Sequence, residues 1–184
     1  MSIEDFISQS EGEWESMRSG HSLTFKQFEE IVSKITIIIL SKGDRRVLEL
    51  IKNNSNQDSK KITSPFLIRW KSQSNWEENS SLKNNSGSCL LIPIPKSDNH
   101  GIMLRSMGYA EQIQALSNYH FLSDGTLILS TEYYSSIAEE RIWFLSKNVR
   151  CRSSVIRSIN SSAILQTSHA SEVRRLLKKN ENRS

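Results

Sequence analysis

Short apolar runs separated by polar turn residues fill the chain from residue 65 to residue 167. Asn, Asp, Gly and Ser punctuate these runs, and Asp124-Gly125 between two of them predicts a tight hairpin. Runs this short, at this spacing, indicate an antiparallel barrel or a sandwich. The expected strands cover residues 66–70, 88–94, 101–109, 111–122, 126–134, 138–145, 149–156 and 162–167.

The first residues of the chain show a helical spacing instead. Apolar residues from Ile3 onwards share one helical face, and Ser2 with Asp5 has the arrangement of a capping box, with Asp in the place that usually holds Glu. The pattern therefore predicts a helix that ends near Gly12.

A strand and two further helices complete the expected elements. Residues 33–41 are rich in β-branched side chains, which favour a strand. Residues 43–52 place their apolar side chains at helical spacing, so a short helix begun by Asp44 is expected there. The same spacing in residues 168–179 predicts a terminal helix.

Composition narrows the class of protein. A chain of 184 residues fits one domain, which we expect to span residues 1–184. The net charge of +4 admits nucleic acid as a partner. However, no basic strand carries interleaved aromatic residues, so a nucleic-acid-binding module is the least favoured class. The longest apolar run, at 35–40, is too short to span a bilayer, and no secretory signal is present.

The two cysteines, Cys89 and Cys151, show no metal-ligand spacing, so we expect reduced thiols and no metal site. Either one could serve as a covalent carrier thiol, although small buried thiols are common.

Several short motifs together carry a family resemblance. Gly12-Glu13-Trp14 matches the G-x-W signature of lipocalin-like barrels and lies within a wider N-terminal pattern that includes Arg18 and His21. Further motifs are GYAE at 108–111, DGTL at 124–127, TEY at 131–133, AEERIWF at 138–144, NVRCRSS at 148–154 and SEVR at 171–174. Taken together, these motifs resemble the S-type phycobiliprotein lyases, the CpcS/CpeS family, over nearly the whole chain.

That resemblance implies a mainly β fold. The expected architecture is a lipocalin-like, up-and-down antiparallel β-barrel of about ten strands. An N-terminal helix, a short helix after the second strand and a C-terminal helix flank the barrel.

The resemblance also implies an activity. Such a lyase binds a free linear tetrapyrrole (bilin), supplied by a bilin reductase, and attaches it by a thioether bond to a cysteine of a phycobiliprotein apo-subunit. Phycoerythrobilin is favoured over phycocyanobilin, and phycoerythrin β over other acceptors. The bilin is a substrate rather than a permanently bound cofactor. The expected compartment is the cytoplasm of a cyanobacterium or the plastid stroma of an alga, and a homodimer is left open.

A plain carrier of a bilin or another small molecule, without transfer, is the alternative, because the same barrel would serve both functions.

Candidate site residues follow from what a bilin needs: cations for its propionates, a carboxylate for its pyrrole N–H groups, and apolar walls. Arg150, Arg152 and Ser154 alternate along one expected strand, so they share a face. On pattern alone two arginines would face water. The resemblance favours an inward Arg150 that binds a propionate or a chromophore carbonyl.

Glu140 lies across a turn from these residues. A three-residue loop would pair residue 144 with residue 150 and Glu140 with Ser154, which puts Glu140 and Arg150 on one face. A two-residue loop would shift the register and separate them. If inward, Glu140 could accept pyrrole N–H bonds, and otherwise it would be a surface carboxylate.

The remaining candidates come from the N-terminal half and the middle of the chain. His21 could assist proton transfer during thiol addition, or it could be a structural histidine at the barrel mouth. Together with Glu140 and Arg150 it forms the expected catalytic set. The other bilin-binding candidates are Arg18, Trp70, Trp76 and Tyr109, whereas Trp14 and Trp143 are expected in the core.

Overall fold

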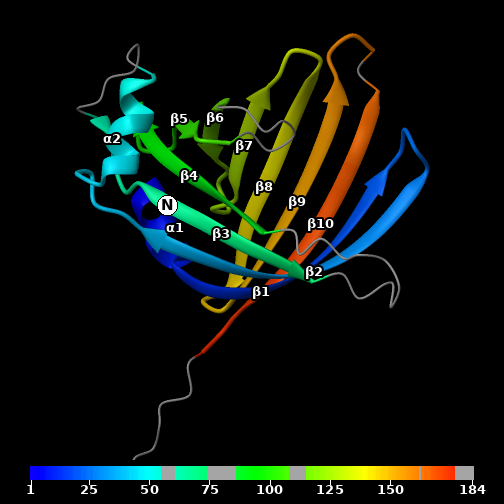
Figure 1. Cartoon of the computed structure of the whole chain (residues 1–184), viewed down its shortest axis with the longest axis horizontal. Helices are drawn as coiled ribbons and strands as arrows, with labels where there is room; N and C mark the ends of the chain where they lie inside the picture. Colours follow the sequence, from blue (N-terminus) through cyan, green and yellow to red (C-terminus); the bar gives the residue numbers. More distant parts are fainter. Residues whose placement is uncertain (55–60, 74–85, 108–114, 162, 177–184) are drawn as a thin grey trace, which may run out of the picture.

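The protein forms a ten-stranded barrel with two helices (Figure 1). The computed structural model describes residues 1–54, 61–73, 86–107, 115–161 and 163–176. The elements, in chain order, are α1 (Ile3–Ser10), β1 (Gly12–Ser22), β2 (Gln27–Ile39), α2 (Arg45–Lys52), β3 (Phe66–Gln73), β4 (Ser86–Pro95), β5 (His100–Arg105), β6 (Ala115–Phe121), β7 (Leu127–Glu132), β8 (Ser136–Ser146), β9 (Val149–Ser158) and β10 (Ile164–Arg174).

All neighbouring strands are antiparallel, and each pairs with the strand that follows it in the chain. The pairing of β1 with β10 closes the barrel. The expected up-and-down barrel of about ten strands is therefore confirmed. Because the barrel is closed, most of β1 is paired on both sides. An unpaired strand edge would favour aggregation.

Helix α1 closes one end of the barrel. The Ser2 hydroxyl accepts a hydrogen bond from the Asp5 backbone N–H at 3.1 Å, which confirms the expected capping box. Phe6 and Ile7 on the inner face of the helix are buried in the main apolar cluster. The Trp14 indole N–H donates to the Ser10 carbonyl at 2.9 Å, so the first residues of β1 fix the end of the helix.

Helix α2 covers the outer face of strands β3, β4 and β5. As expected, Asp44 begins this helix, and its carboxylate accepts a hydrogen bond from the Arg46 backbone N–H at 2.9 Å. The buried face of α2 forms a second apolar cluster with outward-facing residues of β3, β4 and β5: Val47, Leu50, Leu67, Leu90, Ile92, Ile94, Ile102 and Leu104. No helix in the described parts of the chain has the length and apolar character needed to cross a membrane.

The prediction of a C-terminal helix is wrong for residues 168–174, the first seven residues of its expected range. Residues 168–174 belong to strand β10, which pairs with both β1 and β9. Glu172 is 1% exposed and faces inward, whereas Val173 is 52% exposed and faces outward, which is the alternation of a strand. Residues 177–179 lie outside the described residues. Strand β1 was not among the expected strands.

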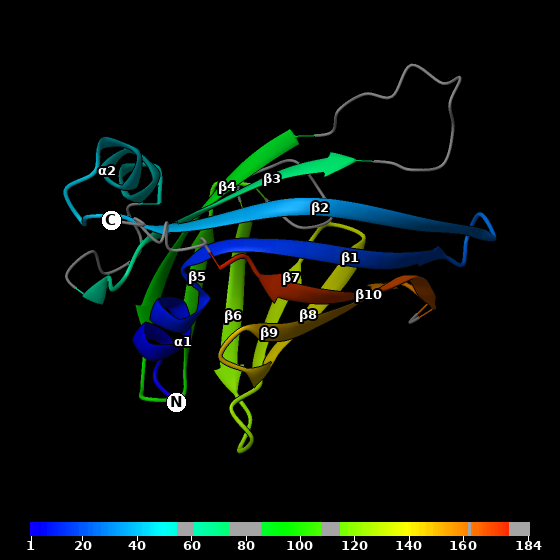
Figure 2. The same cartoon turned by 90° about the horizontal axis from the view of Figure 1, so that it is seen from below.

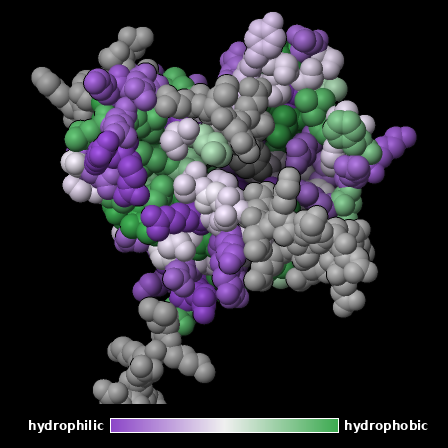
Figure 3. All heavy atoms as spheres, in the orientation of Figure 1, coloured by the Kyte–Doolittle hydropathy of each residue, from purple (hydrophilic) through white to green (hydrophobic). Residues whose placement is uncertain are grey.

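The end of the barrel away from α1 is open, and we call it the mouth. The hairpin turns β1–β2, β7–β8 and β9–β10 project on this side in Figure 1, and β1–β2 reaches furthest from α1 in Figure 2. A hollow of about 420 Å³ lies there, lined by Gly20, Ser22, Gln27, Phe28, Glu29 and Gln166. Figure 3 shows a recess near the middle of the face that is drawn in Figure 1.

Candidate functional site

Strands β8 and β9 carry most of the expected site residues on their inner faces. Glu140 pairs with Ser154, and Phe144 pairs with Arg150, which is the register expected for a three-residue loop. The structure reaches it by a different route: Ser146 pairs with Val149 across a two-residue turn, and an irregularity between residues 144 and 146 restores the register. Glu140 and Arg150 therefore both point into the barrel.

The partner of Glu140 is Arg105, at the end of β5. The guanidinium nitrogen Nη1 lies 2.5 Å from the carboxylate oxygen Oε2, and both residues are buried. Burial disfavours the charged form of Arg105, but the attraction of Glu140 and the hydrogen bond to it outweigh burial and raise the pKa of Arg105. Arg105 thus binds one carboxylate oxygen of Glu140 and places a counter-charge beside it.

The partner of Arg150 is Glu172, on β10. The Nε of Arg150 donates to Oε2 of Glu172, and Arg152 approaches the other carboxylate oxygen at 3.6 Å. Burial opposes the carboxylate form of Glu172, but Arg152, Arg150 and a hydrogen bond from Ser16 lower its pKa. Two cations thus share one carboxylate.

Arg150 itself is 2% exposed. Burial lowers its pKa to about 10, and the guanidinium stays protonated at neutral pH. One of its nitrogens, Nη2, is buried and makes no hydrogen bond to any described residue. An N–H group in this state is costly unless a ligand accepts from it.

The indole ring of Trp14 packs against this cluster at the closed end of the barrel. The guanidinium of Arg150 lies 4.6 Å from the centre of the Trp14 ring, and that of Arg174 lies 4.3 Å from it. Cations over an indole ring are stabilised by its negative face. Trp14 is 1% exposed and occupies the closed end, as expected.

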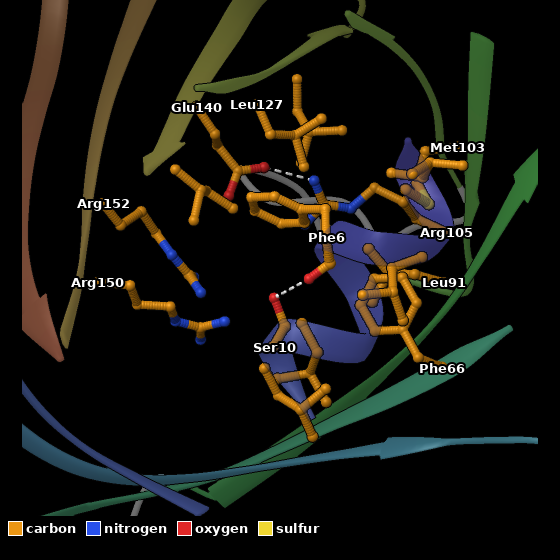
Figure 4. A pocket seen from close by; sticks show the side chains of 16 residues that line it. Phe6, Ser10, Phe66, Leu91, Met103, Arg105, Leu127, Glu140, Arg150 and Arg152 are labelled. Carbon is orange, nitrogen blue, oxygen red and sulfur yellow. Dashed lines mark hydrogen bonds and ion pairs between the residues drawn. The ribbon is translucent and has the colours of Figure 1, made fainter. Parts of the chain in front are cut away.

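These groups surround a small cavity between α1 and the barrel wall (Figure 4). Its volume is about 50 Å³, far below the roughly 300–1,000 Å³ of typical ligand pockets. The nitrogens of Arg150 and Arg152 point into the same open space from one side, and Glu140 reaches towards Arg105 on another. Apolar walls come from α1, β4, β5 and β7: Phe6, Ile7, Leu91, Met103, Leu127 and Leu129.

Towards the mouth the inner wall becomes rich in hydroxyl groups. Hydroxyl pairs join β9 to β10, β6 to β7 and β2 to β3, at oxygen–oxygen distances of 2.7, 2.6 and 3.0 Å. The residues of these pairs are Ser154 with Ser168, Ser117 with Thr131, and Ser33 with Ser72. The interior therefore changes from apolar and cationic at the closed end to neutral and polar near the mouth.

The structure brings some of the other candidates to this interior. Arg18 alternates inward on β1, towards the mouth, and forms an ion pair with Glu29 at 2.8 Å. Trp70 is partly buried, packs against the main apolar cluster and lies over Gly87, where even a Cβ would be 2.3 Å from the indole. His21 is exposed and contacts Phe28, with the ring centres 4.9 Å apart.

His21 therefore lies on the outer face of β1, and the structure does not place it with the rest of the expected catalytic set. Trp76 and Tyr109 lie outside the described residues. Trp143, expected in the core, is partly buried on the outer face, 6.0 Å from the His169 ring.

Cys89 and Cys151 are buried free thiols. Within the described residues, no group of three or more His, Cys, Asp or Glu side chains could hold a metal ion.

Sequence reasoning missed Arg105 and Glu172. The motif SEVR at 171–174 contains Glu172, but the expected helix hid the strand alternation that turns it inward. Arg105 lies within the expected strand 101–109, where nothing in the local pattern pairs it with Glu140. Arg105 reaches Glu140 across the barrel, whereas Glu172 lies directly opposite Arg150 on the neighbouring strand.

Comparisons with known proteins agree on one family. The family model described as "CpeS-like protein" matches residues 2–175. A protein named "Chromophore lyase CpcS/CpeS 3" from Trichodesmium erythraeum is 44% identical over 176 residues, which are 95% of this chain and 99% of that protein. A protein named "Putative phycoerythrobilin lyase CpeS" from Microchaete diplosiphon is 40% identical over 82% of this chain and 66% of its own length.

A solved structure agrees with these matches. It is described as the S-type phycobiliprotein lyase CpeS from Guillardia theta. It superposes with a TM-score of 0.82 and 33% identity, over 97% of this chain and 95% of the other.

Proposed function

The chain belongs to the CpeS-like family of chromophore lyases, and we propose that it binds free phycoerythrobilin and attaches it to a cysteine of phycoerythrin β. The choice of this bilin, rather than phycocyanobilin, rests on the names of two similar proteins. The proposed compartment is the cytoplasm of a cyanobacterium, because its curated relatives are cyanobacterial. The observation that carries the proposal is a buried guanidinium without a complete set of acceptors inside a barrel with one open end.

The charge of the inner cluster fits the two propionates of a bilin. Arg150 and Arg152 both contact Glu172, and Nη2 of Arg150 has no acceptor among the described residues. A propionate oxygen would supply that acceptor in a charge-assisted hydrogen bond. Binding of the propionate would therefore remove the energetic cost of the unsatisfied Arg150 N–H group.

Glu140 fits the other polar edge of the bilin. Arg105 binds one of its carboxylate oxygens, and the second oxygen could accept pyrrole N–H bonds and favour the protonated pigment. Arg105 already provides the counter-charge, so Glu140 need not lose its hydrogen bond when the ligand arrives.

The volume of the cavity limits how much of the bilin it can hold. A volume of about 50 Å³ cannot contain four pyrrole rings. We therefore place the propionates of the two central rings against Arg150 and Arg152, with the pyrrole rings reaching towards the mouth along the hydroxyl-rich wall. Trp70, Arg18 and Ser154 border this path, and the aromatic face of Trp70 can stack on a pyrrole ring.

The proposed reaction is an addition with no loss of atoms. The acceptor sulfur forms a bond to the ethylidene carbon of ring A, the ethylidene double bond becomes single, and the thiol proton ends on the adjacent ring carbon. No oxidant is required. The protein contributes by holding one conformer and one face of the bilin towards the incoming thiol, which replaces a search in solution by a fixed approach.

The first experiment tests the function itself. The chain is co-produced with bilin-synthesis enzymes and one apo-subunit at a time, and each subunit is examined for pigment that survives denaturation. Pigment on phycoerythrin β in amounts well above those without the chain is expected. If the chain binds bilin but leaves every subunit unpigmented, it is a carrier and the lyase proposal fails.

The second experiment tests the site. Arg152→Gln removes a cation from the interior, and Arg141→Gln removes an exposed arginine from the outer face of the adjacent strand β8. We expect the dissociation constant for the bilin to rise about tenfold or more in Arg152→Gln, because a charge-assisted bond is lost. It should be unchanged in Arg141→Gln. Equal affinities in both variants would remove the arginines from the proposed site.

A further inference from the structure

Large apolar side chains gather on the turns that border the mouth. The β1–β2 hairpin carries Leu23, Phe25 and Phe28, which are 50%, 73% and 58% exposed. Tyr134, in the β7–β8 turn, is fully exposed. Two isoleucines of the β9–β10 connection, Ile159 and Ile164, are 39% and 44% exposed. We call these six residues the apolar half-rim.

The half-rim is continuous around the barrel. Its turns belong to β2, β1, β10, β9, β8 and β7, which are consecutive neighbours in the closed sheet. The three hairpins project on the same side in Figures 1 and 2, away from α1. The turns β3–β4 and β5–β6, which complete the circle, lie outside the described residues.

Turn tips in a barrel of this kind are normally polar, since a polar tip costs nothing in water. Helix α1 covers the apolar interior at the closed end, and α2 covers the apolar outer wall, whereas the six residues of the half-rim are exposed. Clusters of exposed apolar residues mark interaction sites. The half-rim is therefore a candidate interaction surface.

We propose that the apolar half-rim is the docking surface for the apo-subunit that receives the bilin, an inference that rests on the proposed lyase function. The acceptor sulfur must come within bonding distance of ring A, and α1 blocks the other end of the barrel. An acceptor must therefore approach over the mouth.

Two other occupants fit the position less well. A second copy of the chain seated on the half-rim would cover the mouth and stop delivery. A lipid surface would do the same. The number of exposed side chains also suits a transient complex better than an obligate dimer, whose interface is larger and more apolar as a whole. A partner that leaves after each transfer requires a small patch of this kind.

The test separates docking from bilin binding. The variants are Leu23→Ser with Phe25→Ser on the β1–β2 hairpin, and Tyr134→Ser on the β7–β8 turn. Leu145→Ser is the matched control, because Leu145 is 66% exposed but lies beside the β8–β9 turn at the closed end. Affinity for free bilin is measured on each variant without pigment. Affinity for purified apo-subunit, and the dependence of the transfer rate on apo-subunit concentration, are then measured on each bilin-loaded variant.

We expect the rim variants to bind the apo-subunit about tenfold or more weakly, since exposed aromatic residues dominate such interfaces. The KM for the apo-subunit should rise in proportion, while bilin affinity and kcat stay unchanged. Leu145→Ser should behave as the unmodified chain, and Phe25→Leu should retain most of the affinity for the apo-subunit.

Three results would overturn the inference. The first is an unaltered affinity for the apo-subunit in the rim variants. The second is a loss of bilin binding that matches the loss of transfer, which would make the half-rim part of the bilin site. The third is an unaltered acceptor affinity combined with loss of self-association in sedimentation, or of binding to phosphatidylglycerol vesicles. Retained docking without any pigment transfer by the unmodified chain would instead refute the lyase function.

Discussion

At the scale of single residues, the interior of the barrel depends on charges that have almost no access to water. Arg105 is 8% exposed and Glu140 is 3% exposed. A buried ion pair is often no more stable than an apolar pair of equal volume, but an unpaired buried charge is strongly unfavourable. The pair therefore contributes to function more than to stability, and removing one member should be worse than removing both.

This argument gives a prediction for the free energy of unfolding. Glu140→Ala leaves Arg105 buried and unpaired, so the protein should lose roughly 3–5 kcal/mol. The double variant Arg105→Met with Glu140→Met should recover most of that loss in urea denaturation. It should still bind bilin poorly, because the carboxylate acceptor is absent. A double variant no more stable than Glu140→Ala would contradict the account.

Local sequence patterns predicted which side chains share a face of β8 and β9, but not the charged partners of those side chains. Alternation along residues 150–154 placed three side chains on one face, whereas the turn before them left two registers open for Glu140. Glu172 lies directly opposite Arg150 on the next strand and was missed because a helix was expected there. The contact of Glu140 with Arg105 joins β8 to β5 and depends on how the whole sheet curves, which a local pattern does not contain.

At the scale of elements, strands that line a polar cavity lose the usual sequence signature. β1 places Trp14, Ser16, Arg18 and Gly20 on its inner side. Because most of these residues are polar or small, no apolar alternation marks the strand. In β10 the inward Glu172 and outward Val173 reverse the usual pattern, so the sequence favoured a helix there. The errors therefore fall on the strands that build the candidate site.

Strand β10 also secures α1. Arg174 donates hydrogen bonds from its guanidinium to the carbonyl oxygens of Gln9, at 2.5 Å, and Glu11, at the C-terminal end of the helix. A cation is favourable at this end of a helix dipole. The neighbouring Arg175 makes only long contacts of 3.8 and 3.9 Å to two exposed carboxylates.

We expect Arg174→Met to lower the free energy of unfolding by about 1–2 kcal/mol, because charge-assisted hydrogen bonds are lost. Amide exchange should become faster in α1 than in the rest of the protein. Arg175→Met should change stability by less than about 0.5 kcal/mol, as exposed ion pairs usually do. Equal effects of the two substitutions would show that Arg174 does not anchor the helix.

At the scale of the whole molecule, we expect the stability of the closed barrel to depend on pH. Glu172 joins β10 to β9 through Arg150 and to β1 through Ser16. Burial alone would raise its pKa, but the neighbouring arginines lower it below the ordinary value of 4.5. The contribution of Glu172 to stability is therefore complete above about pH 4.5 and is lost as the pH falls through its folded pKa.

The contribution of Glu172 should therefore leave the urea midpoint nearly constant from pH 7 to pH 5. At pH values below 4.5, the urea midpoint should decrease. Asp44, whose pKa is lowered to about 2 by its hydrogen bonds with Arg46, adds a smaller loss in the same direction. In Glu172→Gln, the acid-dependent part of the decrease should be shallower, although the protein is less stable at every pH. An unchanged slope in that variant would exclude Glu172 as the main titrating group.

The helix that blocks one end of the barrel has a consequence for the proposed function. With α1 in place, the proposed docking surface surrounds the same opening through which the pigment would enter and leave. We therefore expect loading and delivery to exclude each other in time, with bilin bound first and the apo-subunit second. An apo-subunit that docks too early should close an empty lyase and delay it. The rate of assembly should then follow the ratio of free pigment to unpigmented subunit rather than the amount of either alone.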